Sequence, residues 1–298
     1  MLKIRKETIV RPLKKGDSFR VAASSSVVDN QEEILEGLKV LEGWGLNCIE
    51  NKVFGREWGY LAGKDSERAL ELYKNDSSKL VIFAKGGWGA ARLLGSTNRW
   101  NNGWFLGYSD ITSLIFSRTS NGFHGSVHGP MLNSISKEPE WSKDRLRALL
   151  FGEKLPDLYG ESWNSGIAKG PLIAANLTVG THLIGTNHMP NLKGSILILE
   201  DIGEEPYRID RMLTHWRLTG LLNDVAGIGF GIFKHCAPKD IHNQRTFDIK
   251  QILKDRTMDL GIPVIGGLPI GHIQGNAAMP IGHMASINGN QGKLRIIY

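Results

Sequence analysis

Cysteine is scarce in this chain of 298 residues, which has only Cys48 and Cys236 and no Cys-x-x-Cys pair. This excludes a disulfide framework and a cysteine zinc site, and it fits a reducing compartment, so we expect a cytoplasmic protein. No stretch approaches the about 18 consecutive apolar residues of a membrane-spanning helix. No apolar segment of a secretion signal follows the basic residues at the N-terminus. We therefore expect no membrane partner.

Charge of one sign is not in large excess either. The 36 Lys and Arg residues and the 30 Asp and Glu residues leave a formal net charge of +6. Isoleucine and valine interrupt the densest basic stretch, which comprises Lys3, Arg5, Lys6, Arg11, Lys14 and Lys15. Because a nucleic-acid-binding surface needs basic residues gathered on one face, we expect no nucleic-acid partner. The apolar content of 41% and the charged content of 22% exclude a disordered chain.

Short apolar segments alternate with amphipathic segments through residues 1–150. Such alternation is typical of βαβ units around a parallel sheet, where ligands bind at the carboxyl ends of the strands. The sequence therefore predicts an α/β domain whose functional loops follow Ala84 and Leu106. The pattern predicts strands at 18–23, 47–49, 79–84 and 104–106, and helices at 31–43, 65–75 and 111–118.

Residues 151–169 lack periodicity and carry scattered glycine, proline and asparagine, so they are predicted to form a linker. Residues 170–298 then form a second domain. It is predicted to have a helix that begins at Pro206, because proline is favoured in the first turn of a helix. Its predicted strands lie at 194–200, 225–231, 262–265 and 293–298.

Three glycines, Gly86, Gly87 and Gly89, closely follow the strand predicted to end at Ala84. Backbone amides in such a turn can approach an anionic group. Arg92 stands where a dinucleotide-binding G-x-G-x-x-G motif requires its third glycine, and no G-x-x-x-x-G-K-[ST] loop occurs. We therefore expect no nucleotide cofactor. The alternative interpretation is that these glycines serve only a tight turn.

Ser109 lies between a predicted strand and a predicted helix, in Gly107-Tyr108-Ser109-Asp110. This is the setting of a nucleophile elbow, in which the serine hydroxyl projects from a sharp turn. The G-x-S-x-G pattern is half met, because Ile111 occupies the position of its second glycine. A serine that caps the following helix is the alternative interpretation.

A nucleophilic serine needs a base, and the base needs a carboxylate that fixes its tautomer. His272 lies in a glycine-rich loop, and Glu200 ends an apolar strand, so the two supply these groups. Considered separately, each residue has an alternative interpretation: His272 as a solvated histidine in a loop, and Glu200 as the polar end of a strand. His124 and His128 are four residues apart among glycines, which predicts a hydrogen-bonded turn rather than a pair of metal ligands. We expect no metal.

Ordered motifs along nearly the whole chain give it a resemblance to a known family. They are Ala84-Lys85-Gly86-Gly87-Trp88-Gly89, Gly107-Tyr108-Ser109-Asp110-Ile111-Thr112, His128-Gly129-Pro130-Met131, Asn176-Leu177-Thr178, Ile198-Leu199-Glu200-Asp201, Pro206-Tyr207-Arg208-Ile209-Asp210-Arg211 and Pro269-Ile270-Gly271-His272. In these motifs the chain resembles the LD-carboxypeptidase family of serine peptidases, which includes muramoyltetrapeptide carboxypeptidases. The family usually has Arg and Tyr where Lys85 and Trp88 stand here.

The resemblance implies a flavodoxin-like N-terminal domain with a parallel sheet and a smaller, β-rich α/β C-terminal domain. It implies a catalytic triad of Ser109, Glu200 and His272, with the serine in one domain and the other two residues in the second. The oxyanion donors would be the amides of Asp110 and Gly87. Neither a metal nor a cofactor would be needed.

The reaction implied is release of the terminal D-alanine from a cytoplasmic murein tetrapeptide during peptidoglycan recycling. The resemblance also implies that the murein peptide is the substrate and that the protein forms a homodimer. Trp88 would contact the substrate. Arg208 and Arg211 lie three residues apart on a predicted helix, where one could bind the terminal carboxylate of the substrate. Ion pairs with Asp210 or Glu204 are the alternative role for these arginines.

Two other functions remain open at this point. The microcin-immunity branch of the same family cleaves peptidyl or aminoacyl nucleotide conjugates. A catalytically silent protein would keep the fold as a binding module for muropeptides.

Overall fold

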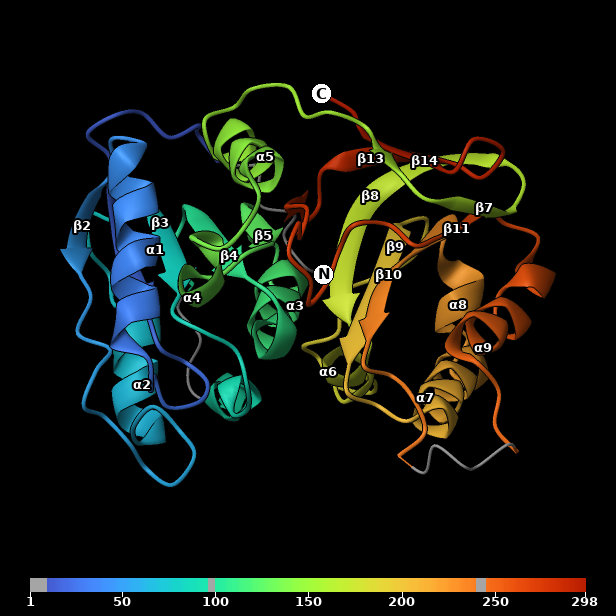
Figure 1. Ribbon diagram of the computed structural model, residues 1–298, viewed down its shortest axis with the longest axis horizontal. Helices are drawn as coiled ribbons and strands as arrows, with labels where there is room; N and C mark the ends of the chain where they lie inside the picture. The colour runs from blue at the N-terminus through green and yellow to red at the C-terminus, as the bar shows by residue number, and fades with distance from the viewer. Residues whose placement is uncertain (1–9, 96–99, 240–244) are drawn as a thin grey trace. The chain divides into compact units, whose positions relative to one another are not determined.

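The computed structural model describes residues 10–95, 100–239 and 245–298, and the chain divides into two compact units (Figure 1). The first unit contains the chain up to Lys154 together with Gly185–Pro190 and Ala277–Ile281. The second contains Leu155–Ile184, Asn191–Asn276 and Gly282–Tyr298. Of the basic N-terminal stretch, Lys3, Arg5 and Lys6 lie outside the described residues.

The first unit is built around a sheet that has six strands within the described residues, in the order β12-β5-β4-β3-β1-β2. All neighbours are parallel except β12 and β5. The sequence β2-β1-β3-β4-β5 is the flavodoxin order, so the predicted fold of this part is confirmed. The strands are β1 (Ser18–Ala22), β2 (Asn47–Glu50), β3 (Leu80–Phe83), β4 (Trp104–Gly107), β5 (Ser126–His128) and β12 (Met279–Pro280).

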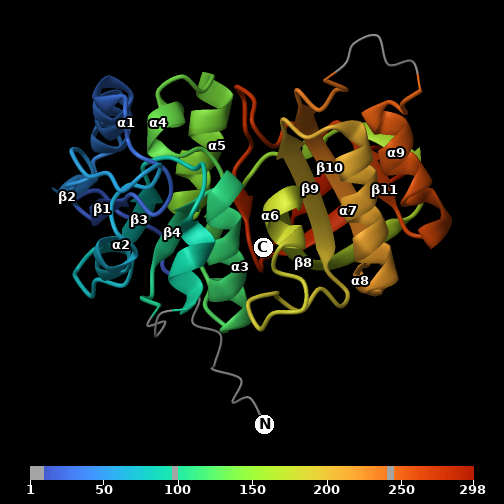
Figure 2. The same ribbon diagram turned by 90° about the horizontal axis from the view of Figure 1, so that it is seen from below.

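Helices cover both faces of this sheet. In Figure 2, α1 and α4 lie on one face and α2 and α3 on the other. The central strands β3 and β4 are buried throughout, which explains why they are continuous apolar runs rather than alternating ones. The helical elements are α1 (Gln31–Gly43), α2 (Asp65–Leu72), η1 (Ala90–Gly95), η2 (Ser109–Ile111), α3 (Thr112–Ser120), α4 (Leu132–Ile135) and α5 (Glu140–Leu150).

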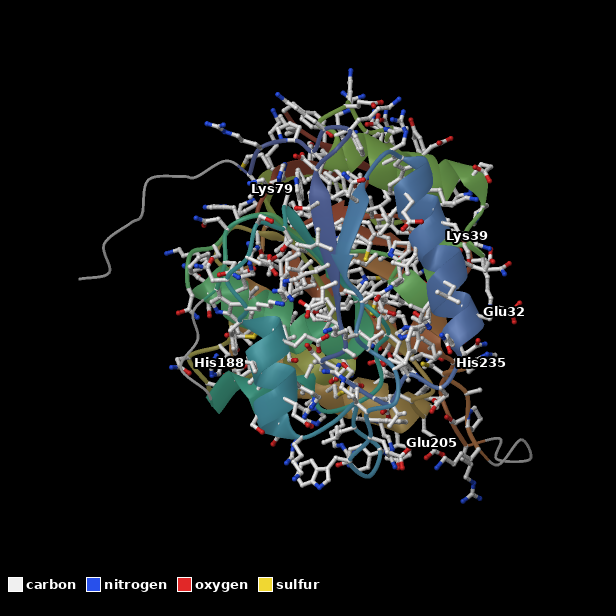
Figure 3. All side chains as sticks on the ribbon, turned by 90° about the vertical axis from the view of Figure 1, so that its left-hand side faces the viewer. Glu32, Lys39, Lys79, His188, Glu205 and His235 are labelled. Atoms are coloured by element: carbon white, nitrogen blue, oxygen red, sulfur yellow. The ribbon has the colours of Figure 1, made fainter. Side chains whose placement is uncertain are left out.

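Helix α1 shows how the sequence encodes this layer. Asn30 caps its N-terminus by accepting a hydrogen bond from the amide of Glu33. Ile34, Leu38 and Leu41 recur at helical spacing and are buried toward the sheet. The opposite face is exposed and carries charged residues, among them Glu32 and Lys39, both labelled in Figure 3.

The second unit contains a mixed sheet with eight strands in the described part of the chain, in the order β6-β14-β13-β8-β9-β10-β11-β7. The strands β8, β9, β10 and β11 are parallel, and the others pair antiparallel. The sheet therefore combines an α/β core with a β-rich margin, as predicted. The strands are β6 (Leu158–Tyr159), β7 (Glu161–Asn164), β8 (Ile167–Asn176), β9 (Ile196–Ile202), β10 (Gly227–Lys234), β11 (Val264–Gly266), β13 (Met284–Asn288) and β14 (Lys293–Ile296).

Strand β8 is the longest of these and joins the two parts of the sheet. Its first half, Ile167–Pro171, pairs with β13, and its second half, Leu172–Asn176, pairs with β9. The helices of this unit pack around α7, and they are α6 (Leu177–Thr181), α7 (Pro206–Leu218), α8 (Leu221–Asp224), α9 (Ile249–Asp255) and the short η3 (Met258–Leu260). None of the helices in the described residues is long and apolar enough to cross a membrane.

Two sequence-based predictions are wrong. The segment 151–169 is not a plain linker, because it contains β6, β7 and the start of β8. β6 and β7 lie at the two ends of the sheet, and β7 has only exposed and half-buried residues, so no hydrophobic alternation marked it. His124 and His128 do not form a turn, because His128 lies on β5 and is wholly buried.

Candidate active site

The strand order of the first sheet reverses between β1 and β3, which makes this the topological switch point of the sheet. Ligands of such sheets bind at the carboxyl ends of the strands at this point. The loop after β1 carries Ser24, Ser25 and Ser26, and the loop after β3 carries residues 85–89. The turn with Ser109 follows β4, which is paired with β3.

Ser109 has the backbone conformation of a strained turn. Its φ of 61° lies in the left-handed region, and His235 is the other non-glycine residue with positive φ in the described part of the chain. Such a conformation is costly for a residue with a Cβ, and residues held in it cluster at functional sites. Ser109 begins η2 directly after β4, which is the strand–turn–helix arrangement of a nucleophile elbow.

Two glycines make room for this turn. A Cβ on Gly107 would lie 2.8 Å from Cγ2 of Ile111, so the residue before the turn has to be small because Ile111 packs against it. A Cβ on Gly86 would lie 3.2 Å from the hydroxyl oxygen of Ser109. The loop after β3 therefore lies beside the Ser109 hydroxyl, with only main chain at that point.

The main chain of the loop after β3 is fixed against Ser26. The amide of Trp88 donates a 3.1 Å hydrogen bond to Oγ of Ser26, and the amide of Ser26 donates to the carbonyl of Gly86. Gly87 has a φ of 116°, and a Cβ there would overlap with Ser26 Oγ. Gly87 is thus required by its conformation and by a close approach.

Asp110 points its side chain into the unit. Its Oδ2 accepts a 2.7 Å hydrogen bond from the hydroxyl of Ser25 and a 2.8 Å bond from the amide of Ala90. Burial raises the pKa of this carboxyl, while the two hydrogen bonds and the charge of Arg68 act in the opposite direction.

In the second unit, Glu200 and His272 form a direct pair. Oε2 of Glu200 lies 2.8 Å from Nδ1 of His272. Glu200 is wholly buried near the carboxyl end of β9, whereas the side chain of His272 keeps an exposed fraction of 15%. A carboxylate on Nδ1 holds the imidazole in one orientation and directs proton exchange to Nε2. The pair that the sequence proposed is therefore present.

The loop that carries His272 is held by the side chain of Asn276. The amide of Gly271 donates a 3.0 Å hydrogen bond to Oδ1 of Asn276, whose side chain is buried. Gly271 has a φ of 121°, and a Cβ on it would lie 2.8 Å from Oε2 of Glu200. Only glycine allows the loop to pass this close to the carboxylate.

Asp201 follows Glu200 and joins the ends of β8 and β9. Its Oδ1 accepts hydrogen bonds from Nδ2 of Asn176 and the amide of Ile202, and its Oδ2 accepts from the amide and hydroxyl of Thr178. Burial, together with the neighbouring charge of Glu200, raises the pKa of Asp201 to about 6. The strand thus presents one carboxylate to His272 and the next to the start of α6.

The residues proposed as substrate contacts lie on the surface of their units. Trp88 is 68% exposed, and its ring meets the ring of Tyr60 edge-on at 6.5 Å between centroids. Arg208 and Arg211 line a cavity of about 330 Å³ between α6 and α7. Arg208 also lies 3.7 Å from the carboxylate of Glu204, whereas Asp210 pairs with Arg256 instead.

The structure thus places Ser109, Asp110, Gly87 and Trp88 in the first unit, and brings Glu200 and His272 together in the second. Sequence reasoning missed the side-chain roles of four residues, namely Ser25, Arg68, Asp201 and Asn276. The serine run after the first strand was the one available signal for Ser25. Within the described residues, no group of three or more His, Cys, Asp and Glu side chains could hold a metal ion.

Comparisons with known proteins agree over both halves of the chain. The family model described as the LD-carboxypeptidase N-terminal domain matches residues 20–129, and the LD-carboxypeptidase C-terminal domain matches residues 169–287. A putative carboxypeptidase of Synechocystis is 39% identical, over 96% of this chain and 96% of its own length. A probable murein peptide carboxypeptidase of Bacillus subtilis is 33% identical, over 93% of this chain and 91% of its own length.

The solved structure of the microcin C7 self immunity protein has a TM-score of 0.85 to this structure. The alignment covers 97% of this chain and 98% of that chain at 20% sequence identity. A likeness at this identity shows a shared fold alone.

Proposed function

Because the chain belongs to the LD-carboxypeptidase family, and is therefore a peptidase, we propose that it is a serine carboxypeptidase that releases the terminal D-alanine from a murein tetrapeptide. The observation that carries the proposal is the 2.8 Å hydrogen bond between Glu200 and His272. A buried carboxylate on one ring nitrogen is the arrangement that prepares a histidine as a general base. The name of the Bacillus subtilis relative supports a murein peptide as the substrate.

In the proposed reaction, Ser109 is the nucleophile. Nε2 of His272 takes the proton of the Ser109 hydroxyl as its oxygen attacks the carbonyl carbon of the scissile bond. His272 then gives this proton to the amine of the departing D-alanine. Water, activated by the same histidine, hydrolyses the acyl-enzyme and regenerates the serine. Glu200 orients the ring and stabilises the imidazolium in both steps.

Two main-chain amides are proposed to stabilise the oxyanion, those of Asp110 and Gly87. Charge develops on the carbonyl oxygen in the transition state, and fixed amide dipoles stabilise it there without reorganisation. The strained turn at Ser109 supports this role, since in a nucleophile elbow the amide after the serine faces the developing charge.

Substrate binding is proposed to involve Trp88 and the cavity lined by Arg208 and Arg211. A murein peptide carries several carboxylates, and guanidinium groups bind them through paired hydrogen bonds. Arg208 shares its charge with Glu204, so Arg211 is the stronger candidate for a substrate carboxylate. We propose that the enzyme acts in the cytoplasm, as a homodimer, on murein peptides that are being recycled.

The test is to incubate the purified protein with murein tetrapeptide and to detect tripeptide and D-alanine by mass spectrometry, with and without a metal chelator. We expect release that the chelator does not change and that is lost in Ser109→Ala and His272→Ala. Normal release by Ser109→Ala would overturn the mechanism.

The two other functions are separated in the same experiment. An aminoacyl sulfamoyl adenylate serves as the second substrate, and its cleavage without cleavage of the tetrapeptide would favour a nucleotide-conjugate hydrolase. A protein that cleaves neither substrate and does not react with a serine-directed fluorophosphonate would be a binding module.

A further inference from the structure

We propose that Asp110 is a positioning residue whose side chain holds the loop of Gly87 against the turn of Ser109, and so fixes the separation of the two oxyanion amides. Ser25 and Arg68 assist it from neighbouring elements. The inference rests on the proposed function, because it assigns a second role to a residue of the same oxyanion site.

The side chain of Asp110 joins three loops through one oxygen. Asp110 follows β4, Ser25 follows β1, and Ala90 begins η1 directly after the loop that follows β3. Oδ2 of Asp110 accepts from the Ser25 hydroxyl at 2.7 Å and from the Ala90 amide at 2.8 Å. Since Ala90 lies three residues after Gly87, the carboxylate of one proposed donor residue restrains the loop of the other.

Arg68 restrains the same loop from α2. Its side chain is wholly buried, and it donates hydrogen bonds to the carbonyls of Ser24 and Gly89, the second at 3.0 Å. A third hydrogen bond goes to Oδ1 of Asp65 at 2.5 Å. Three consecutive residues at the end of this loop and the start of η1 are therefore held, Trp88 by Ser26, Gly89 by Arg68 and Ala90 by Asp110.

The charge of Arg68, which is paired directly with Asp65, also acts on Asp110. Asp110 has an exposed fraction of 7% and Arg68 of 0%, so both charged groups carry a desolvation cost. Burial raises the pKa of Asp110, whereas the hydrogen bonds from Ser25 and Ala90 and the charge of Arg68 act in the opposite direction. Both hydrogen bonds are accepted by the same oxygen, Oδ2. This arrangement suits a carboxylate used to hold main chain in place and not to transfer protons.

The chemistry explains why such precision matters. An oxyanion hole works when both donors lie at hydrogen-bond distance from the oxygen in the transition state, and a displacement of about 1 Å can cost about 100-fold in rate. Loss of this restraint should therefore lower kcat and leave KM nearly unchanged, because the interaction is made in the transition state and not in the ground state.

The experiment compares single variants that change one buried polar group each. Asp110→Asn keeps the size of the side chain but removes the charge, and we expect about a 100-fold loss in kcat with KM within about twofold. Ser25→Ala removes one of the two hydrogen-bond donors to Asp110 and leaves the amide of Ala90, so kcat should fall by about 10-fold. The double variant should lose little more than Asp110→Asn, because the two groups act through one hydrogen bond.

The matched control is Ser24→Ala. It removes a buried hydroxyl from the loop that carries Ser25. Within the described part of the chain this hydroxyl makes no hydrogen bond, and the carbonyl that accepts from Arg68 stays. We expect normal kcat. Losses in Ser25→Ala no larger than those in Ser24→Ala, or a rise in KM without a fall in kcat, would overturn the role of Asp110. Ser25→Ala keeps the proposal testable even where Asp110→Asn does not fold.

A second readout separates this inference from the proposed substrate. The rate at which a fluorophosphonate modifies Ser109 depends on the oxyanion donors but not on a murein peptide. Wild-type protein that reacts with the probe but releases no D-alanine would contradict the substrate, and slower labelling of Asp110→Asn and Ser25→Ala would still support the positioning role. Equal labelling rates in all variants would overturn it. A wild-type protein that shows neither reaction would overturn both proposals.

Discussion

Oε2 of Glu200 and Nδ1 of His272 lie 2.8 Å apart, although the two residues are held by different kinds of structure. Glu200 is fixed on a strand in the middle of a sheet, and His272 follows a glycine whose amide is bound by Asn276. The strand sets the position of the carboxylate, and the loop sets the position of the ring. Changes to either should therefore act on the same distance.

Replacement of the carboxylate itself tests the first half of this arrangement. Glu200→Gln should lower kcat by about 10⁴-fold, because an amide neither stabilises the imidazolium nor selects the required tautomer. KM should change little. The assay is D-alanine release at saturating and limiting tetrapeptide. Asp259→Asn, which alters an exposed carboxylate of the same unit, should remain fully active. Equal activity of the two variants would exclude Glu200 from the mechanism.

Replacement of Gly271 by alanine tests the loop. The new Cβ would lie 2.8 Å from Oε2 of Glu200, so the pair must separate, and we expect a loss of at least about 100-fold in kcat. Gly267→Ala is the matched control, because Gly267 also has a positive φ but has open space where a Cβ would lie. Both variants should lose stability in urea unfolding. Loss of activity in both, to the same degree, would show that strain and not the contact with Glu200 is responsible.

The strained backbone of Ser109 predicts a difference in stability. Ser109→Ala and Ser109→Gly both remove the proposed nucleophile and should be inactive. Glycine relieves the strain of a φ of 61°, so Ser109→Gly should have the larger free energy of unfolding, by about 1 kcal/mol. His235, with a φ of 53°, gives the parallel comparison at an exposed position outside the site, where both variants should stay active. If Ser109→Gly is less stable than Ser109→Ala, the backbone at position 109 is not strained.

The raised pKa of Asp201 predicts a pH dependence of stability. Its pKa rises from an ordinary value of 3.8 to about 6, so between these values the folded protein binds more protons than the unfolded chain. The free energy of unfolding of the wild type should then fall as pH rises through this window, by up to about 3 kcal/mol relative to Asp201→Asn. Urea unfolding of both proteins from pH 4 to pH 7 measures the difference.

One result would contradict this prediction, and one variant serves as its control. A difference between wild type and Asp201→Asn that stays constant with pH would contradict it. The control is Asp259→Asn, because Arg217 lowers the pKa of Asp259 from its ordinary value of 3.8. Between pH 4 and pH 7 the difference between wild type and this variant should therefore stay nearly constant, and the wild type should lose stability relative to the variant only as pH falls below this range.

The sequence predicts the parts of this fold that local patterns encode. β3 and β4 are continuous apolar runs, and the alternation of such runs with helices indicates a parallel sheet. Ser109 could be found because a strand, a short glycine-bearing turn and a helix follow in order. β7 could not, because a polar strand at the margin of a sheet has no periodicity of its own.

Contacts between distant residues explain what the sequence did not predict. Arg68 lies on a charged helix, where an arginine is usually solvated, yet the loops after β1 and β3 bury it completely. Asn276 has no local feature that links it to Gly271. For Glu200 and His272 the sequence could propose a pair from their chemistry, but they are 72 residues apart, so the contact itself follows from the pairing of whole strands.

The small strand β12 completes the first sheet from a part of the chain that is synthesised late. Met279 and Pro280 pair with His128 and Val127 of β5, and they are the outermost part of the first sheet. A ribosome makes β5 about 150 residues before it makes β12, and domains begin to fold as they emerge. The nascent first unit thus carries an open sheet edge until most of the second unit has been translated. Once β12 has paired, Pro280 lies at that edge, and proline has no backbone N–H group that could pair with another strand.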